Sequence, residues 1–211
     1  MQNNSIMKKL LILLFFLSST SVFADDISDF EIEGISIGDS LLDYMTEDEI
    51  LEEIERTKDW HPHLKEPNKY ASVYLGGKFK NYDYLGFVIK NNQTNQYVTN
   101  KNEKYIIRSI LGNADYIENF DACIYKRDQI VDLFSRSFPN AQKIESILNH
   151  GVDPSGKSII DAVYFEFNSG IVIEVSCTKL DEVFRRKMGW SEGLMVLITP
   201  KEIDDWLTTH K

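Results

Sequence analysis

The feature that most constrains the fold of this chain is a series of short segments in which apolar residues alternate with polar ones. Such alternation is typical of strands that bury one face. Turn residues separate the segments, and Asn168-Ser169-Gly170 joins two of them as a hairpin. We expect strands at residues 35–37, 70–75, 83–90, 104–111, 143–148, 158–167, 171–178 and 194–198.

Helical patterns lie before, between and after these strands. Residues 118–138 place Cys123, Val131 and Phe134 on one apolar face, and Pro139 ends this helix. Two capping boxes mark the starts of other helices, and they pair Thr46 with Glu49 and Thr199 with Glu202. Asp39 or Ser40 can cap a helix that begins at Leu41, and residues 180–187 are expected to form another.

The order of these elements defines the expected fold class. Strands come in hairpins with helices before and after them, and no repeat or linker divides the chain. The sequence therefore predicts an α+β fold, an antiparallel sheet with helices packed on one face, in a single domain over residues 25–211.

Residues 1–24 have the pattern of a secretory signal peptide. Lys8 and Lys9 precede an unbroken apolar run over residues 10–17, and Ala24 stands at the expected cleavage site before Asp25. A retained membrane anchor is the alternative, but residues 10–24 include polar side chains and are fewer than the roughly 20 apolar residues that span a bilayer. We expect a periplasmic or secreted protein with no transmembrane segment after cleavage.

The charge of the chain is strongly acidic. A net charge of −10 becomes −12 without the two lysines of the N-terminal segment. Such a chain is repelled by the phosphates of nucleic acids and of anionic membranes. The charge therefore argues against nucleic acid as a partner.

Cys123 and Cys177 both remain after cleavage of the signal peptide. An even number of cysteines in an exported chain favours a disulfide. Cys123 lies on the apolar face of the 118–138 helix, and Cys177 shares the inward face of strand 171–178. Both thiols thus point at the same interior, although two buried free thiols are the alternative.

Residues 32–44, IEGISIGDSLLDY, resemble the opening of a group of uncharacterised short exported bacterial proteins. The helix that carries Cys123, with the segment RDQIV at residues 127–131, is similar to the middle of those proteins. The resemblance spans most of the mature chain and implies no known activity. Residues 34–40, GISIGDS, also resemble the start of small outer-membrane-assembly lipoproteins, but the leucine-glycine-proline turn of those proteins is absent here.

Residues 151–158, GVDPSGKS, satisfy the P-loop pattern, in which glycines allow backbone N–H groups to surround phosphates. A P-loop is followed by a helix, whereas residues 159–167 alternate as a strand does. Asp153 would also repel phosphates. We therefore interpret this segment as a hairpin turn built on Asp153-Pro154-Ser155-Gly156.

Two further clusters resemble metal sites only weakly. His61 and His63 are separated by a proline, and no third ligand has a matching spacing. The acidic residues between Asp43 and Glu53 lack the loop and the glycine of a calcium-binding EF-hand. We interpret these clusters as a solvated loop and a solvated helix face, and we expect no metal and no cofactor.

Aromatic residues gather around the first strands of the predicted sheet. Most of them suit the packing of a sheet, but tyrosines at strand ends are also common in binding surfaces. The candidate binding patch consists of Tyr70, Tyr74, Tyr82 and Tyr84.

The sequence contains no HExxH motif, no CxxC pair and no convincing catalytic triad. It therefore favours a non-enzymatic binding or interaction module of the cell envelope, whose partner is an envelope protein or a small ligand. A hydrolase with dispersed catalytic residues and a small-ligand binding protein that uses the concave side of the sheet are the alternatives.

Overall fold

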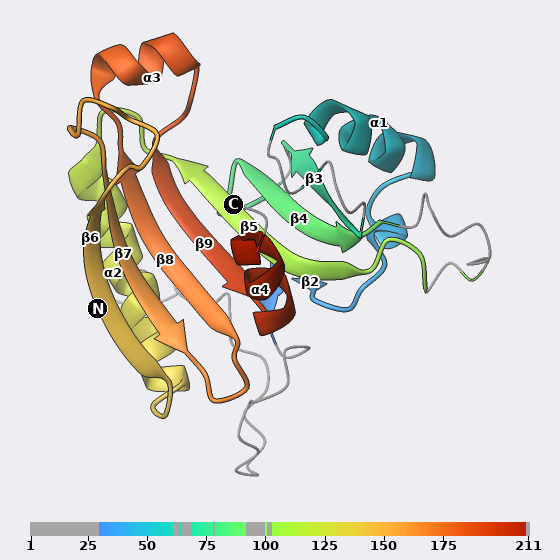
Figure 1. Cartoon of the computed structure of the whole chain (residues 1–211). Helices are drawn as coiled ribbons and strands as arrows, with labels where there is room; N and C mark the ends of the chain where they lie inside the picture. Colours follow the sequence, from blue (N-terminus) through green and yellow to red (C-terminus); the bar gives the residue numbers. More distant parts are fainter. Residues whose placement is uncertain are drawn as a thin grey trace, which may run out of the picture.

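The computed structural model describes residues 30–60, 64, 69–77, 79–91, 100 and 103–209. Its main element is a seven-stranded antiparallel sheet with the order β3-β4-β5-β9-β8-β7-β6 (Figure 1). The strands are β3 (Tyr70–Gly76), β4 (Tyr84–Lys90), β5 (Ile107–Asp115), β6 (Gln142–Asn149), β7 (Ile159–Glu166), β8 (Val172–Lys179) and β9 (Gly193–Thr199). The short strands β1 (Glu31–Ile32) and β2 (Ile35–Ser36) pair separately. The expected signal peptide lies outside the described residues.

The last strand joins the two halves of the sheet. β9 pairs with β5 on one side and with β8 on the other, although long stretches of chain separate it from β5. Ile173, Val175 and Cys177 on β8 are fully buried, as their alternation predicts. The expected α+β class with an antiparallel sheet is confirmed.

Strand β5 begins and ends later than the sequence predicts. Tyr105 has a positive φ of 50°, and the preceding carbonyl of Lys104 accepts a hydrogen bond from the Ser40 hydroxyl at 2.8 Å. Residues 104–106 thus contact the N-terminal segment, where Ile106 bridges to Ser40, and the strand begins at Ile107. At the other end the strand continues through Gly112 to Asp115. The ring of Tyr82 packs against Gly112, where a Cβ would lie only 2.7 Å from it, so a residue with a side chain would not fit there.

The helices occupy both faces and one edge of the sheet, which differs from the expectation of a single covered face. Helix α2 (Phe120–Ser137) packs on β8 and β9, behind the sheet in Figure 1, and α4 (Lys201–Thr209) lies in front. Trp206 of α4 packs with Tyr70 and Val88, whose side chains point away from the main core. Phe87 and Ile89, the neighbours of Val88, belong to that main core.

Helix α1 (Glu47–Thr57) lies along the outer edge of β3. Its predicted capping box is present, because Thr46 and Glu49 exchange side-chain to backbone hydrogen bonds. At the end of the helix, the Thr57 hydroxyl donates to the carbonyl of Ser72 at 2.7 Å. Ser40 also caps as predicted, but only a short 3-10 helix follows it, at Leu41–Asp43.

The second predicted capping box, at the start of α4, is wrong. Thr199 is the last residue of β9, and its hydroxyl is buried without a hydrogen-bond partner among the described residues. The carboxylate of Glu202 instead accepts hydrogen bonds from the Tyr70 hydroxyl and, at 2.9 Å, from Lys69. This contact with residues distant in the sequence replaces the predicted bond between Glu202 and the backbone at Thr199. The carbonyl of Pro200 accepts the first hydrogen bonds of the helix.

Candidate functional site

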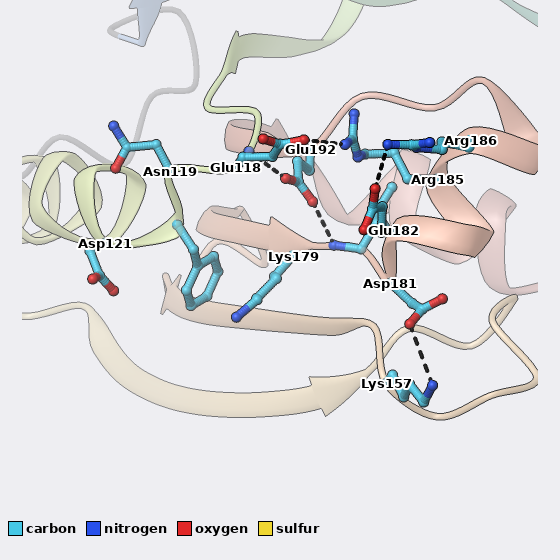
Figure 2. A pocket seen from close by; sticks show the side chains of 12 residues that line it. Glu118, Asn119, Asp121, Lys157, Lys179, Asp181, Glu182, Arg185, Arg186 and Glu192 are labelled. Atoms are coloured by element: carbon cyan, nitrogen blue, oxygen red, sulfur yellow. Dashed lines mark hydrogen bonds and ion pairs between the residues drawn. The ribbon is translucent and has the colours of Figure 1, made fainter.

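A pocket of about 720 Å³ lies between the start of α2, the end of β8 and helix α3 (Glu182–Met188), as Figure 2 shows. Its volume falls in the range of known small-molecule sites. Most of the side chains around it are charged. The lining residues are Glu118, Asn119, Phe120, Asp121, Lys157, Lys179, Leu180, Asp181, Glu182, Arg185, Arg186 and Glu192.

The carboxylate of Glu192 joins two walls of the pocket. The residue is only 7% exposed, and it accepts hydrogen bonds from the backbone N–H of Glu118 at 2.7 Å and of Leu180 at 2.9 Å. These charge-assisted bonds hold the loop before α2 against the end of β8. The pocket walls are therefore fixed before any ligand arrives.

The opposite wall is held by the turn between β6 and β7. The hydroxyl of Ser158 accepts a hydrogen bond from the backbone N–H of Asp181 at 2.8 Å, and it donates to Asp153 at 2.6 Å. Asp181 in turn caps α3 by accepting from the N–H groups of Val183 and Phe184. This connection places the cap of α3 at the pocket.

The same turn contains the sequence that resembles a P-loop. The Asp153 carboxylate accepts from Ser158 and Ser155, and these bonds hold the pKa of Asp153 well below its usual range although desolvation acts in the opposite direction. Strand β7 follows directly, with no helix. The predicted hairpin turn is confirmed, and its carboxylate organises the turn.

The backbone of Glu118 adopts an unusual conformation at the rim of the pocket. Its φ is +58°, in the left-handed region that non-glycine residues adopt rarely. The bond to Glu192 and an ion pair with Arg185 at 3.0 Å hold it there. Strained backbone of this kind concentrates at ligand-binding and active sites.

Most charges of the pocket pair with one another. Figure 2 shows Glu118 with Arg185, Glu182 with Arg186, and Lys157 with Asp181, the last at 3.7 Å. Three charged groups of the lining have no ion-pair partner among the described residues. Glu192 accepts two backbone hydrogen bonds instead, whereas no hydrogen bond to a described residue is seen at the charged groups of Lys179 and Asp121. Phe120 also lines the pocket, and its ring centre lies 5.6 Å from the Lys179 ammonium.

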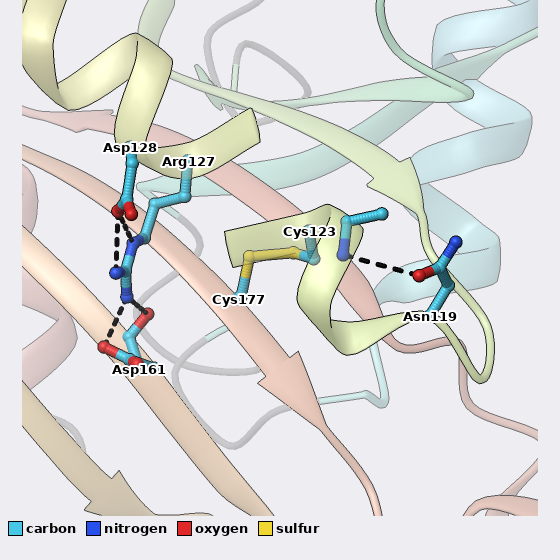
Figure 3. Close-up of a disulfide and its surroundings, with 7 residues drawn as sticks. Asn119, Cys123, Arg127, Asp128, Asp161 and Cys177 are labelled. Atoms are coloured by element: carbon cyan, nitrogen blue, oxygen red, sulfur yellow. Dashed lines mark hydrogen bonds and ion pairs between the residues drawn. A yellow bond between two sulfur atoms is a disulfide. The ribbon is translucent and has the colours of Figure 1, made fainter. Parts of the chain in front are cut away.

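The disulfide links the two elements that carry Phe120 and Lys179. Cys123 and Cys177 are bonded, with Cα atoms 6.0 Å apart, and both are fully buried (Figure 3). Cys123 follows Phe120 by one turn of α2, and Cys177 precedes Lys179 by two residues on β8. The predicted bridge is confirmed, and it fixes the two elements that carry the ring and the free ammonium.

A buried ion pair, also shown in Figure 3, adds a second link between α2 and the sheet. The guanidinium of Arg127 contacts Asp161 on β7 and Asp128 on its own helix, the latter at 2.8 Å. Arg127 is 9% exposed and shares the inward face of the helix with Val131. The expected apolar face therefore contains one charged residue, which Asp161 balances from the sheet.

The four tyrosines of the candidate patch do not form one surface. Tyr70 is 2% exposed and lies beneath α4 against Trp206, at a ring-centre distance of 4.9 Å. Tyr82 packs on Gly112, on the main-core side of the sheet. Desolvation by burial raises the pKa of Tyr82 to about 12.

Tyr74 and Tyr84 do lie together, on the face of the sheet that also carries α4. Their ring centres are 6.0 Å apart, and Trp60 continues the row at 5.5 Å from Tyr74. The Arg56 guanidinium lies over the Trp60 ring at 4.5 Å, and a Cβ at Gly86 would lie 2.9 Å from the Tyr74 ring. The patch remains a prediction, reduced to this half-exposed row.

The weak metal motifs differ in how far they can be placed. His61 and His63 lie outside the described residues. Acidic residues of α1 already have partners within the protein, since Glu49 completes the capping box, Glu53 forms an ion pair with Arg56 at 2.7 Å, and Glu47 forms one with Lys104 at 3.1 Å. Within the described ranges, no group of three potential metal ligands comes together.

Comparison with known proteins gives no family assignment. No protein-family model matches the chain, and neither a curated protein nor a solved structure matches it significantly. The assignment of function therefore depends on the geometry of the pocket.

Sequence reasoning missed the residues that form the pocket. Glu192 follows a helix in a polar loop and belongs to no motif, and Glu118 is one of many acidic residues in the chain. The position of Lys179, two residues after Cys177, is the one signal that could have connected a free charge with the disulfide.

Proposed function

We propose that this protein is an exported, non-enzymatic binding protein whose ligand occupies the pocket between α2, α3 and β8. The observation that carries the proposal is a preformed pocket of about 720 Å³ in which, among the described residues, every charged group except Lys179 and Asp121 has an ion-pair partner or backbone hydrogen bonds. A preorganised site of this size binds without the cost of ordering its walls.

The free groups of the pocket indicate the chemical class of the ligand. Lys179 offers an ammonium to an anionic group, Asp121 offers a carboxylate to a cationic one, and Phe120 offers an apolar ring between them. A zwitterion with an apolar part, such as an amino acid or a short peptide, matches all three. A ligand that carries charge of only one sign can pair with only one of the two charged groups, Lys179 or Asp121.

The composition of the lining favours binding over hydrolysis. The described residues that line the pocket include no serine, threonine, cysteine or histidine to serve as a nucleophile or an imidazole base. Glu192, the most buried carboxylate there, is occupied by two backbone N–H groups. A hydrolase remains the alternative, and turnover of a bound peptide would identify it.

Export is supported by the disulfide and by the N-terminal signal pattern. Disulfides such as Cys123–Cys177 form and persist in oxidising compartments, including the periplasm and the extracellular space. Across the described helices, none combines the length and the apolar character needed to cross a membrane.

A thermal-shift screen tests the proposal with three classes of probe, namely amino acids and dipeptides, dicarboxylates, and polyamines. We expect only the first class to raise the Tm. At a concentration one hundred times the Kd, the stabilisation is about 2.7 kcal/mol, or roughly 5–10 °C for a chain of this size.

Two variants locate the binding in the pocket. Lys179→Met and Asp121→Asn each remove one free charge with little change of shape, and each should abolish the shift. Lys187→Met is the matched control, because Lys187 is an exposed lysine outside the lining. If all variants retained the rise in Tm, the pocket would not be the binding site. If polyamines alone raised the Tm, the ligand would not be a zwitterion.

A further inference from the structure

The two edges of the seven-stranded sheet differ in how they are covered. At β3, α1 satisfies outward backbone groups, because Thr57 donates to the Ser72 carbonyl and the Tyr74 N–H donates to Glu53 at 3.1 Å. At the other edge, β6 has β7 as its sole sheet neighbour in the described part of the chain. Edges left open in this way are templates for pairing with another strand.

The pairing of β6 with β7 shows which backbone groups point outward. The N–H of His150 donates to the carbonyl of Ser158, and hydrogen-bonded pairs alternate along an antiparallel ladder. The even-numbered residues of β6 therefore bond to β7. Lys143, Glu145 and Ile147 direct their N–H and C=O groups away from the sheet.

The side chains of β6 are largely exposed, and they include apolar residues, which edge strands that are protected against pairing seldom expose. Ile147 is 68% exposed and Leu148 is 46% exposed. Lys143 and Glu145, which have opposite charges and stand two residues apart, form an ion pair at 2.7 Å. Neither the exposed apolar residues nor a charge pair of zero net charge prevents pairing with a strand of complementary pattern.

We propose that β6 pairs antiparallel with β6 of a second copy of this chain, with Ile144 opposite the partner's Ile144. A two-fold axis at this residue places Lys143 opposite the partner's Glu145, and Glu145 opposite the partner's Lys143. Both charges then gain a cross-strand partner, and the apolar residue meets itself on the axis.

The charges also select this register over its neighbours. Moving the axis by one residue, to the next arrangement that keeps side chains on the same face, places Glu145 directly opposite the partner's Glu145, which is repulsive. Moving it once more places Lys143 opposite the partner's Asn149 and leaves the charges without partners. The proposal is independent of the ligand pocket, because no residue of β6 lines it.

Sedimentation velocity over a range of concentrations tests the dimer, with protein purified after export so that its natural N-terminus is retained. Wild-type protein should sediment as a dimer that dissociates on dilution. Lys143→Glu or Glu145→Lys places like charges opposite each other twice, and each should raise the dissociation constant at least about tenfold. The double exchange K143E/E145K restores opposite charges and should restore the dimer.

The double exchange also controls for folding, because both side chains are exposed and single variants that misfold would not be rescued by a second change. Three results would overturn the proposal. These are a monomer at every concentration, a dimer whose dissociation constant is unchanged by the single charge changes, and a monomer that instead pairs with added extended peptides.

Cysteine cross-linking tests the register. Ile144 would face its symmetry copy in a pair without hydrogen bonds, where Cα atoms are about 4.5 Å apart, within reach of a disulfide. Ile144→Cys should therefore give a covalent dimer under mild oxidation. Ser146→Cys, on the same face of β6, should not, and efficient cross-linking there with none at Ile144→Cys would contradict the register.

Discussion

Removal of the disulfide is the perturbation whose effect the structure predicts most directly. Cys123 and Cys177 are separated by 54 positions in the sequence, and the bridge closes this long loop in the unfolded chain. The loop-closure entropy for this length corresponds to about 4 kcal/mol at 25 °C. We therefore expect the double variant C123A/C177A to lose about 4 kcal/mol of unfolding free energy.

This loss is large relative to the stability of a typical domain, which is about 5–15 kcal/mol. It corresponds to a decrease in Tm of roughly 8–16 °C for a chain of this size. Equilibrium unfolding in urea measures it, with the wild-type protein kept oxidised. The double variant is preferable to single ones, because a lone buried thiol would be free to form mixed disulfides on unfolding.

Two outcomes would refute this reasoning. A difference in unfolding free energy below about 1 kcal/mol would show that the bridge does not constrain the unfolded chain as its loop length requires. Alkylation of both thiols in unfolded, unreduced wild-type protein would show that the bridge is absent. After reduction in denaturant, two labels per chain are expected.

Three further predictions concern the supports of the pocket and the packing of the sheet. Glu192→Gln should destabilise the fold by about 2 kcal/mol in urea unfolding, because one of two buried backbone N–H groups then faces an amide NH₂. The pKa of Asp153 is lower in the folded protein than its value near 4 in the unfolded chain, so its contribution to stability is present above about pH 4 and is lost as the pH falls from there toward the folded pKa. Asp153→Asn should therefore flatten the acid limb of the stability–pH curve. Gly193→Ala should cost at least about 1–3 kcal/mol, since the Cβ would lie 2.1 Å from a backbone oxygen, whereas Gly76→Ala meets open space and should be nearly neutral in the same unfolding assay.

Local signals predicted the regular elements well. The capping box at Thr46, the alternation of Ile173, Val175 and Cys177, and the turn at Asp153 each depend on residues close together in the sequence, and each is present in the structure. Such features are set by backbone hydrogen bonds and side-chain periodicity, which a sequence displays directly.

The errors arose where a distant contact competes with a local one. Glu202 bonds to Tyr70 and Lys69 and not to the backbone near Thr199. The chain bends at Asp83, so Tyr82 and Tyr84 point to opposite faces although alternation would place them on the same face.

The pocket could not be predicted, because its residues share no pattern in the sequence. Glu118, Lys179 and Glu192 come from three separate segments, and they meet because β9 inserts between β5 and β8. This insertion depends on long-range pairing that neither periodicity nor capping encodes.

Binding of a zwitterionic ligand in the pocket between α2, α3 and β8 would change the amide chemical shifts of the lining residues. Two-dimensional ¹H–¹⁵N spectra would be recorded while dipeptides are titrated into the oxidised protein. We expect saturable shifts centred on Phe120, Lys179 and Leu180, and no such shifts in the Lys179→Met variant. Saturable shifts confined to the row formed by Trp60 and Tyr74, or no shifts at any concentration, would contradict it.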